Sequence, residues 1–215
     1  MLLHLLLLWF RSFAMQPSPS SSSTSPPPPP PTTTTTIFHQ RQQWLRCGLH
    51  AVNNVLQADV ARASDFQHLA DAHALIAGRG PWLHRLGLGD YDANTMIEFL
   101  QDRAHCSVEF INRCRANAEL SAHLAGPKLL QGFLVNVQRR NNLWQQMMIP
   151  SFIHQFRHWY AVVYIKEEPA WYVVDSSQHY VEKLDNVQTY LEQTQADVSL
   201  DATLLVVKGP VERSS

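Results

Sequence analysis

The chain has 215 residues, 45% of them hydrophobic, which is enough to form the core of one ordinary domain. Its 17 basic and 18 acidic residues leave a formal net charge of -1, so no overall field favours nucleic acid or an anionic membrane surface. The three cysteines, Cys47, Cys106 and Cys114, lie far apart without a CxxC pair. This spacing argues against a disulfide framework or a zinc knuckle and favours a reducing compartment.

The beginning of the chain differs in composition from the rest. The apolar run Leu2–Phe10 is shorter than the roughly 18 residues that span a bilayer, so we expect no integral membrane segment. It resembles a secretory signal but lacks the positively charged start, and a chain that begins at Met15 would not contain it. The following Ser-, Pro- and Thr-rich stretch predicts a disordered tether. We therefore expect a leader and tether at 1–36, a folded domain at 37–209 and a short tail at 210–215.

Helical patterns occupy the first half of the folded domain, and strand patterns occupy most of the second. The first expected helix runs from near Cys47 to before Asp59. The second lies over SDFQHLADAHALIAG, with a capping box of Ser64 and Gln67 and a stop at Gly78, and the third lies within GLGDYDANTMIEFLQDR, with a cap at Asp92 or Asn94. A fourth helix is expected over 186–195. Short β-branched and aromatic runs predict strands at 106–112, 132–137, 158–165, 170–176 and 203–209. This order predicts an α+β fold.

Cys47 stands at the start of the first expected helix, ahead of an apolar stripe and followed by Gly48. The unpaired N–H groups and the positive end of the helix dipole favour a thiolate there, and glycine lets a substrate approach closely. The alternative is a buried structural cysteine, which is common for this residue type. A nucleophilic thiolate would also need an imidazole to hold its proton and a third group to orient that imidazole.

The stretch FRHWYAVVYIKEEPAWYVVDSS supplies both groups in one expected hairpin. A turn centred near Lys166 and Glu167 would place His158 directly opposite Asp175. A wider turn that shifts the pairing by two residues would leave them diagonal, on the same face and still within reach. Pairing would fix the histidine tautomer and leave its other nitrogen free for a thiol. The alternative is an exposed hairpin face with incidental polar residues.

Upstream of the thiol, Gln42 and Gln43 are candidates for an oxyanion hole, in which a side-chain amide and the backbone N–H of the nucleophile hold the negative oxygen. His50 lies one turn after Cys47, but no second ligand pair completes a metal site, so we expect a structural role. Cys106 and Cys114 lack a helix-start context, and we expect both to be inert.

The motifs IFHQRQQWLRCGLHAVNNVLQ, GLGDYDANTMIEFLQ, GFLVNV, HWYAVVY and WYVVDS resemble the Josephin family of papain-like cysteine proteases, which remove ubiquitin from proteins. The resemblance covers about Ile37 to Gly209 and is weak over 61–86. It implies a papain-like fold in which helices, with the nucleophile at a helix start, pack on an antiparallel sheet formed by the second half. It further implies Cys47 as nucleophile, His158 as general base and acid, Asp175 as orienting residue and Gln42, over Gln43, in the oxyanion hole.

The resemblance implies hydrolysis of bonds after the C-terminal glycine of ubiquitin, with ubiquitin and ubiquitinated proteins as partners and no metal or organic cofactor. We expect a monomer in the cytoplasm or nucleus. Two alternatives remain open at this point. One is an inactive ubiquitin-binding module, and the other is a secreted cysteine peptidase, which requires a functional leader.

Overall fold

Six antiparallel strands form one sheet in the order β1-β6-β2-β3-β4-β5. The computed structural model describes residues 36–42, 46–76, 93–126, 129–138 and 157–209. The chain divides into units 1–34 and 35–215, and every described residue belongs to the second. The expected leader, nearly all of the tether and the tail therefore lie outside the described residues. The strands are β1 (Ser107–Phe110), β2 (Leu130–Gln138), β3 (Arg157–Ile165), β4 (Ala170–Val174), β5 (Glu182–Leu184) and β6 (Thr203–Lys208).

The position of each strand in the sheet follows its composition. The central strands β2, β3 and β6 are nearly continuous runs of buried apolar residues, because helices cover both of their faces. The edge strands β1 and β5 are short and mostly exposed, with charged side chains that discourage pairing with a further strand.

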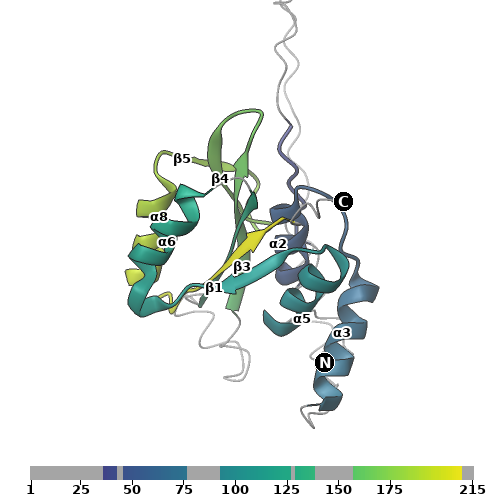
Figure 1. Ribbon diagram of the computed structural model, residues 1–215. Coiled ribbons are helices and arrows are strands. Elements are labelled where there is room, and N and C mark those ends of the chain that lie inside the picture. Colours follow the sequence, from purple (N-terminus) through teal and green to yellow (C-terminus); the bar gives the residue numbers. More distant parts are fainter. Residues whose placement is uncertain (1–35, 43–45, 77–92, 127–128, 139–156, 210–215) are drawn as a thin grey trace, which may run out of the picture. The chain divides into compact units, whose positions relative to one another are not determined.

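The helices form two groups on opposite faces of the sheet (Figure 1). One group contains α2 (Cys47–Leu56), α3 (Ala63–Ile76), α5 (Ala93–Glu98) and the π-helical turn η2 (Phe99–Arg103). The other contains α6 (Ala116–Ala125), which follows the 3-10 turn η3 (Arg113–Arg115), and α8 (Val187–Ala196). Helices packed on an antiparallel sheet confirm the predicted α+β class, and this architecture is consistent with a papain-like fold.

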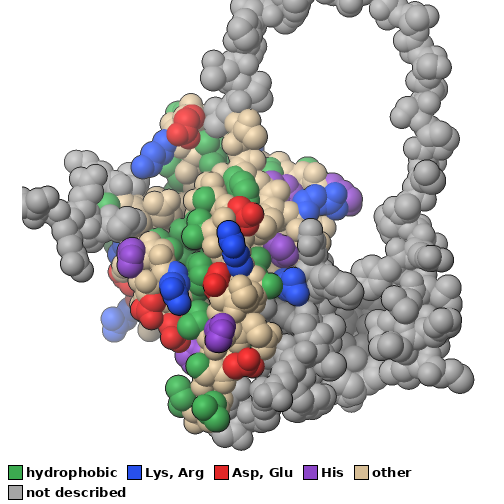
Figure 2. Space-filling model, turned by 90° about the vertical axis from the view of Figure 1, so that its right-hand side faces the viewer, with side chains coloured by type: hydrophobic (Ala, Val, Ile, Leu, Met, Phe, Trp, Pro, Cys, Tyr) green, Lys and Arg blue, Asp and Glu red, His purple; other side chains and the backbone are tan. Residues whose placement is uncertain are grey.

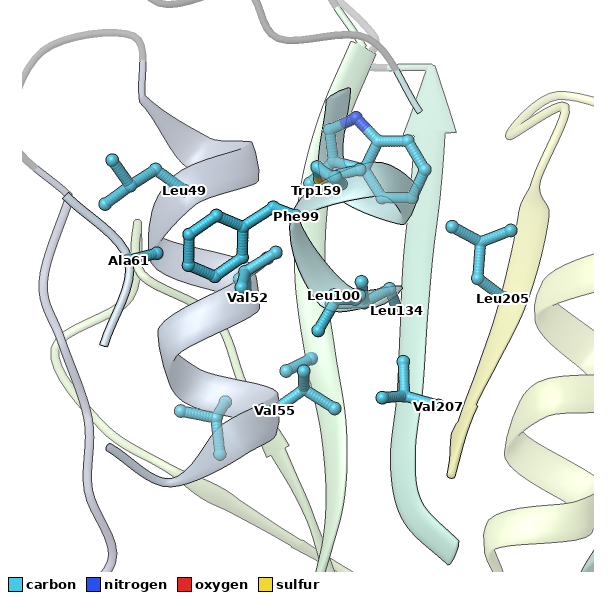
Figure 3. Packing of buried hydrophobic residues seen from close by; sticks show 14 of the residues in the cluster. Leu49, Val52, Val55, Ala61, Phe99, Leu100, Leu134, Trp159, Leu205 and Val207 are labelled. Atoms are coloured by element: carbon cyan, nitrogen blue, oxygen red, sulfur yellow. The ribbon is translucent and has the colours of Figure 1, made fainter. Parts of the chain in front are cut away.

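The α2 face carries the larger apolar cluster (Figure 3). Val52 and Val55 of α2 are fully buried there, together with Phe99 and Leu134. Burial of such side chains stabilises the fold by about 1.5–3 kcal/mol each. Gly132 of β2 allows this close approach, since a Cβ atom there would collide with the Val162 carbonyl oxygen and press on Val55. Cys47 therefore starts a helix that is fixed firmly to the sheet.

Several local expectations differ from the structure. Ser64 does not cap its helix, because α3 begins at Ala63 and the Asp65 carboxylate accepts from the Arg62 N–H instead. Asn94 also lies inside its helix. The helix α6 and the strand β5 were not predicted from the sequence. The candidate cap Asp92 and the candidate stop Gly78 lie outside the described residues.

Charges of both signs are interspersed on the face that Figure 2 shows. Within the described part of the chain, acidic and basic side chains often neutralise one another, as in the pair of Lys208 with Glu109 at 2.7 Å. None of the helices in these described ranges combines the length and the apolar character required to cross a bilayer.

Candidate functional site

The Cys47 thiol lies at the first residue of α2, as predicted. Because Cys47 is the first residue of the helix, its side chain lies at the end where the dipole is positive. Arg46, the residue before it, makes no side-chain cap that would occupy the N–H groups of this end. Cys47 is 7% exposed, and its Sγ lies 3.9 Å from the carbonyl oxygen of Arg157, the first residue of β3. The thiol therefore faces the end of the strand that carries His158.

His158 and Asp175 form a hydrogen bond of 2.7 Å between Nε2 and Oδ1. The directly opposed register is wrong: Ala161 pairs with Val174, a shift of two residues, so His158 and Asp175 are diagonal neighbours. This is the alternative that the wider turn predicts. Asp175 itself lies just beyond the end of β4. The contact survives the shift because side chains two positions apart on a strand share a face.

Several bonds hold Asp175 in place. Its Oδ1 atom also accepts from the Ser177 N–H at 2.8 Å, and its carbonyl oxygen lies 3.0 Å from Nε2 of His39. Burial alone would favour the neutral carboxyl group. The hydrogen bond and positive charge of His158, with the Ser177 N–H, outweigh burial and lower the pKa of Asp175 below its usual value. The carboxylate is therefore ionised at neutral pH.

The imidazole of His158 carries a proton at neutral pH. Burial disfavours the imidazolium, but hydrogen bonds and charges of Asp175 and Cys47 outweigh it and raise the pKa of His158 to about 9. Because Nε2 is taken by Asp175, Nδ1 is the nitrogen left for the thiol. The structure thus brings Cys47, His158 and Asp175 together, and their catalytic roles stay a prediction.

Gln42 is tied to the same region through its backbone. Its N–H donates to the carbonyl oxygen of Ser176 at 2.8 Å, next to Asp175 in the chain. The segment before the nucleophile is thereby joined to the segment that follows β4. A role of the Gln42 side chain in an oxyanion hole stays a prediction, and Gln43 lies outside the described residues.

A network of buried amides, which the sequence analysis missed, fixes this segment to α2. Nδ2 of Asn53 donates to Oε1 of Gln40 at 2.7 Å, and Nδ1 of His50 lies 2.9 Å from the same oxygen. Oδ1 of Asn54 accepts from the Gln40 N–H at 2.7 Å. His50 is structural, as expected. Two adjacent asparagines inside an apolar helical stripe were the signal in the sequence, because buried amides need partners.

The other cysteines take no part in the site. Burial raises the pKa of the Cys106 thiol, which keeps it protonated, and Cys114 is exposed on η3. Across the described ranges, no group of three or more His, Cys, Asp or Glu side chains could hold a metal ion.

Comparison with known proteins identifies the family. The chain is 30% identical to a Josephin-like protein of Drosophila melanogaster over 176 residues, which cover 80% of this chain and 73% of that protein. This chain belongs to the Josephin family. It is also 27% identical to Josephin-2 of Homo sapiens over 182 residues, and these residues cover 83% of this chain and 90% of that protein. No family model matches the sequence. The Josephin resemblance inferred from the motifs is confirmed by these relatives.

Proposed function

We propose that this chain is a deubiquitinating cysteine protease that hydrolyses peptide and isopeptide bonds after the C-terminal glycine of ubiquitin. The observation that carries the proposal is the 2.7 Å bond between His158 and Asp175, made beside the Cys47 thiol in a member of the Josephin family. A thiol next to an imidazole that a carboxylate orients is suited to nucleophilic acyl transfer.

In the first half of the proposed reaction, the Cys47 proton is already held on Nδ1 of His158, and the Cys47 thiolate attacks the carbonyl carbon of the terminal glycine. A carbon–sulfur bond forms, and the carbonyl electron pair moves onto oxygen. The Cys47 backbone N–H and the Gln42 side chain donate hydrogen bonds to this oxyanion, each worth about 3 kcal/mol in the transition state.

In the second half, the carbon–nitrogen bond breaks and His158 donates its proton to the departing lysine amine. The resulting thioester is attacked by water, from which His158 takes a proton. The carbon–sulfur bond then breaks, which restores the Cys47 thiolate beside the protonated His158. The released carboxyl group of ubiquitin gives its remaining proton to solvent and leaves as a carboxylate. Asp175 keeps the imidazole aligned through both steps.

The proposed partners are ubiquitin and ubiquitinated proteins, and the protein would act as a monomer. The reaction as written uses no metal ion or organic cofactor. We place the activity in the cytoplasm or nucleus, because these are the compartments that contain ubiquitinated substrates.

The test is hydrolysis of ubiquitin with a fluorogenic C-terminal amide, beside capture by a ubiquitin probe with a thiol-reactive end. The wild type should release the fluorophore and form a covalent adduct at Cys47. Cys47→Ala and His158→Ala should lose on the order of 10⁶-fold in kcat, and Asp175→Asn about 10⁴-fold, because the last change removes orientation and charge but leaves nucleophile and base.

Cys114→Ser is the matched control, since it removes an exposed thiol far from the helix start, and its capture should equal that of the wild type. Reversible ubiquitin binding without covalent capture would instead indicate a non-catalytic ubiquitin-binding module. A mature protein recovered from culture medium, beginning near Met15 and without activity on ubiquitin, would favour a secreted cysteine peptidase.

A further inference from the structure

The edges of the His158 ring are occupied by Asp175 and Cys47, and one face of the ring is covered by Tyr160. The two ring centroids are 6.2 Å apart and the rings are inclined by 28°. Tyr160 lies two residues after His158 on β3, so both side chains leave the strand on the same side. The Tyr160 side chain is buried, which leaves it little freedom to move away.

The Tyr160 hydroxyl is anchored to α8. Tyr190 Oη donates to Tyr160 Oη at 3.1 Å, and Thr194, one turn later on the same helix face, also hydrogen-bonds that hydroxyl. The Thr194 hydroxyl donates in addition to the Tyr190 carbonyl oxygen at 2.8 Å, which fixes its rotamer. Burial, reinforced by Tyr190, raises the pKa of Tyr160 far above its usual value. The stacked ring is therefore a neutral phenol at every pH at which the site operates.

The imidazole needs such support because its own torsions are soft. The terminal torsion of histidine has a broad minimum, so the ring can turn at little cost. His158 must nevertheless keep both nitrogens in one plane with two partners that come from different segments, Asp175 after β4 and Cys47 at the start of α2. A ring stacked against its face opposes this rotation without using either nitrogen.

We propose that Tyr160, held by Tyr190 and Thr194, is a positioning residue that fixes the plane of the His158 imidazole between Asp175 and Cys47. This inference rests on the proposed function for its effect on rate, but its effect on the imidazole itself is independent of any substrate. The helix α8 thereby contributes to a site from which it supplies no reacting group.

Tyr164 provides a matched control on the same strand. It lies four residues further along β3 and packs against Trp171 with ring centroids 5.4 Å apart and the rings tilted by 51°. It shares the residue type, the strand and the aromatic contact of Tyr160, but its aromatic partner lies outside the triad. Tyr164→Leu therefore measures the cost of losing a tyrosine with an aromatic contact from β3.

The experiment compares Tyr160→Leu, Tyr160→Phe and Tyr190→Phe with Tyr164→Leu in hydrolysis of the fluorogenic ubiquitin conjugate. Tyr160→Leu should lower kcat by about 30-fold with KM unchanged, because a misplaced catalytic group costs rate and not substrate affinity. The two phenylalanine variants keep the ring but lose the hydroxyl pair, so each should lose about 3-fold, and the double variant no more than either. Tyr164→Leu should keep the wild-type kcat.

A second measurement separates positioning from stability and from the proposed function. The imidazole resonances of His158 are titrated by NMR in each variant. In Tyr160→Leu the His158 pKa should fall from about 9 toward its ordinary 6.5, because a ring turned away from Asp175 loses its charge partner. If the wild type hydrolyses nothing, this titration alone decides the inference. A wild-type His158 titration in folded Tyr160→Leu would overturn the inference, whether or not the protein hydrolyses ubiquitin.

Discussion

The two faces of the sheet hold their buried polar side chains by different means. On the α2 face, the amides of Asn53 and Asn54 are fully buried and bond to backbone groups of neighbouring segments. On the α8 face, the hydroxyls behind the site form a local cluster, in which Tyr190 donates to Tyr160 and Thr194 donates to the Tyr190 carbonyl of its own helix. Removing an amide from the first face leaves buried backbone groups without partners, whereas removing a hydroxyl pair leaves few.

This difference indicates that the two faces control different properties of the site. The α2 face carries the nucleophile and fixes the segment that holds Gln42, so it decides whether the site forms at all. On the α8 face, the Tyr160 ring supports the His158 imidazole, and Tyr190 holds the Tyr160 hydroxyl. Apart from α8, these contacts join no further segment of the chain to the site. Substitutions on the α2 face should therefore cost stability first, and substitutions on the α8 face should cost rate first.

The largest stability effect is expected at Asn53. Its Oδ1 atom accepts from the N–H groups of Val60 and Ala61 at 3.0 and 2.7 Å, and its Nδ2 atom donates to Gln40 and to the Ala61 carbonyl. Asn53→Ala removes the bonds to both backbone groups of the buried Ala61, whereas the Val60 N–H keeps the Ala58 carbonyl and Gln40 keeps His50. The loss at Ala61 should lower the free energy of unfolding by about 3 kcal/mol. Urea unfolding followed by circular dichroism measures the change.

Asn117→Ala is the control, because Asn117 is an exposed asparagine on α6. Its free energy of unfolding should stay within about 0.5 kcal/mol of the wild type. Equal stabilities for the Asn53 and Asn117 variants would show that the amide network is not what fixes the α2 face.

A pH-dependent effect of intermediate size is expected from the His158–Asp175 pair. The folded protein raises the pKa of His158 from 6.5 to about 9, so its stabilising contribution is complete below pH 6.5 and is lost as pH rises to about 9. Below pH 6.5, this shift adds up to about 3 kcal/mol to the free energy of unfolding. The lowered pKa of Asp175 acts in the opposite direction, since its contribution is present above the ordinary value of 3.8 and is lost as pH falls through the lowered value.

Thermal unfolding of the wild type and of Asp175→Asn between pH 5 and pH 10 tests this pair. The difference in Tm between the two proteins should be greatest near pH 6 and should shrink toward pH 9. A difference that does not change over this range would contradict a protonated His158 in the folded site.

The sequence predicted the triad geometry because strand periodicity is robust to small errors. The expected turn was two residues too tight, yet a shift of two residues leaves His158 and Asp175 on one face. A shift of one residue would have separated them. The helix start at Cys47 could also be predicted from the sequence, because the apolar stripe of α2 begins there and the residues from Cys47 to Val55 are buried.

The missed features depend on contacts between segments distant in the sequence. The helix α6 buries only Ala116 and Leu120, so its apolar stripe is too weak to recognise. The strand β5 has three residues with two charged side chains, and it is defined by its pairing with β4. The partners of Asn53 lie up to 13 residues away, which no local pattern reveals. Capping at Ser64 failed because the neighbouring Asp65 supplies the acceptor.

The smallest effect is expected at Asp201, outside both buried clusters. Its exposed carboxylate pairs with Arg157 at 2.8 Å and with Arg113 at 3.4 Å, and its backbone has a left-handed φ of 42°. Asp201→Asn keeps a residue type that tolerates this conformation, and the residue 201 carbonyl still accepts from Arg157. Because exposed ion pairs are weak and screened, Tm should fall by less than about 2 °C at low salt and by nothing measurable near 1 M salt. Alanine is strained in the left-handed conformation, so Asp201→Ala should lower Tm further than Asp201→Asn, by an amount that salt does not remove. If both variants instead lose the same amount of Tm and salt removes both losses, the charge of Asp201 alone accounts for its role.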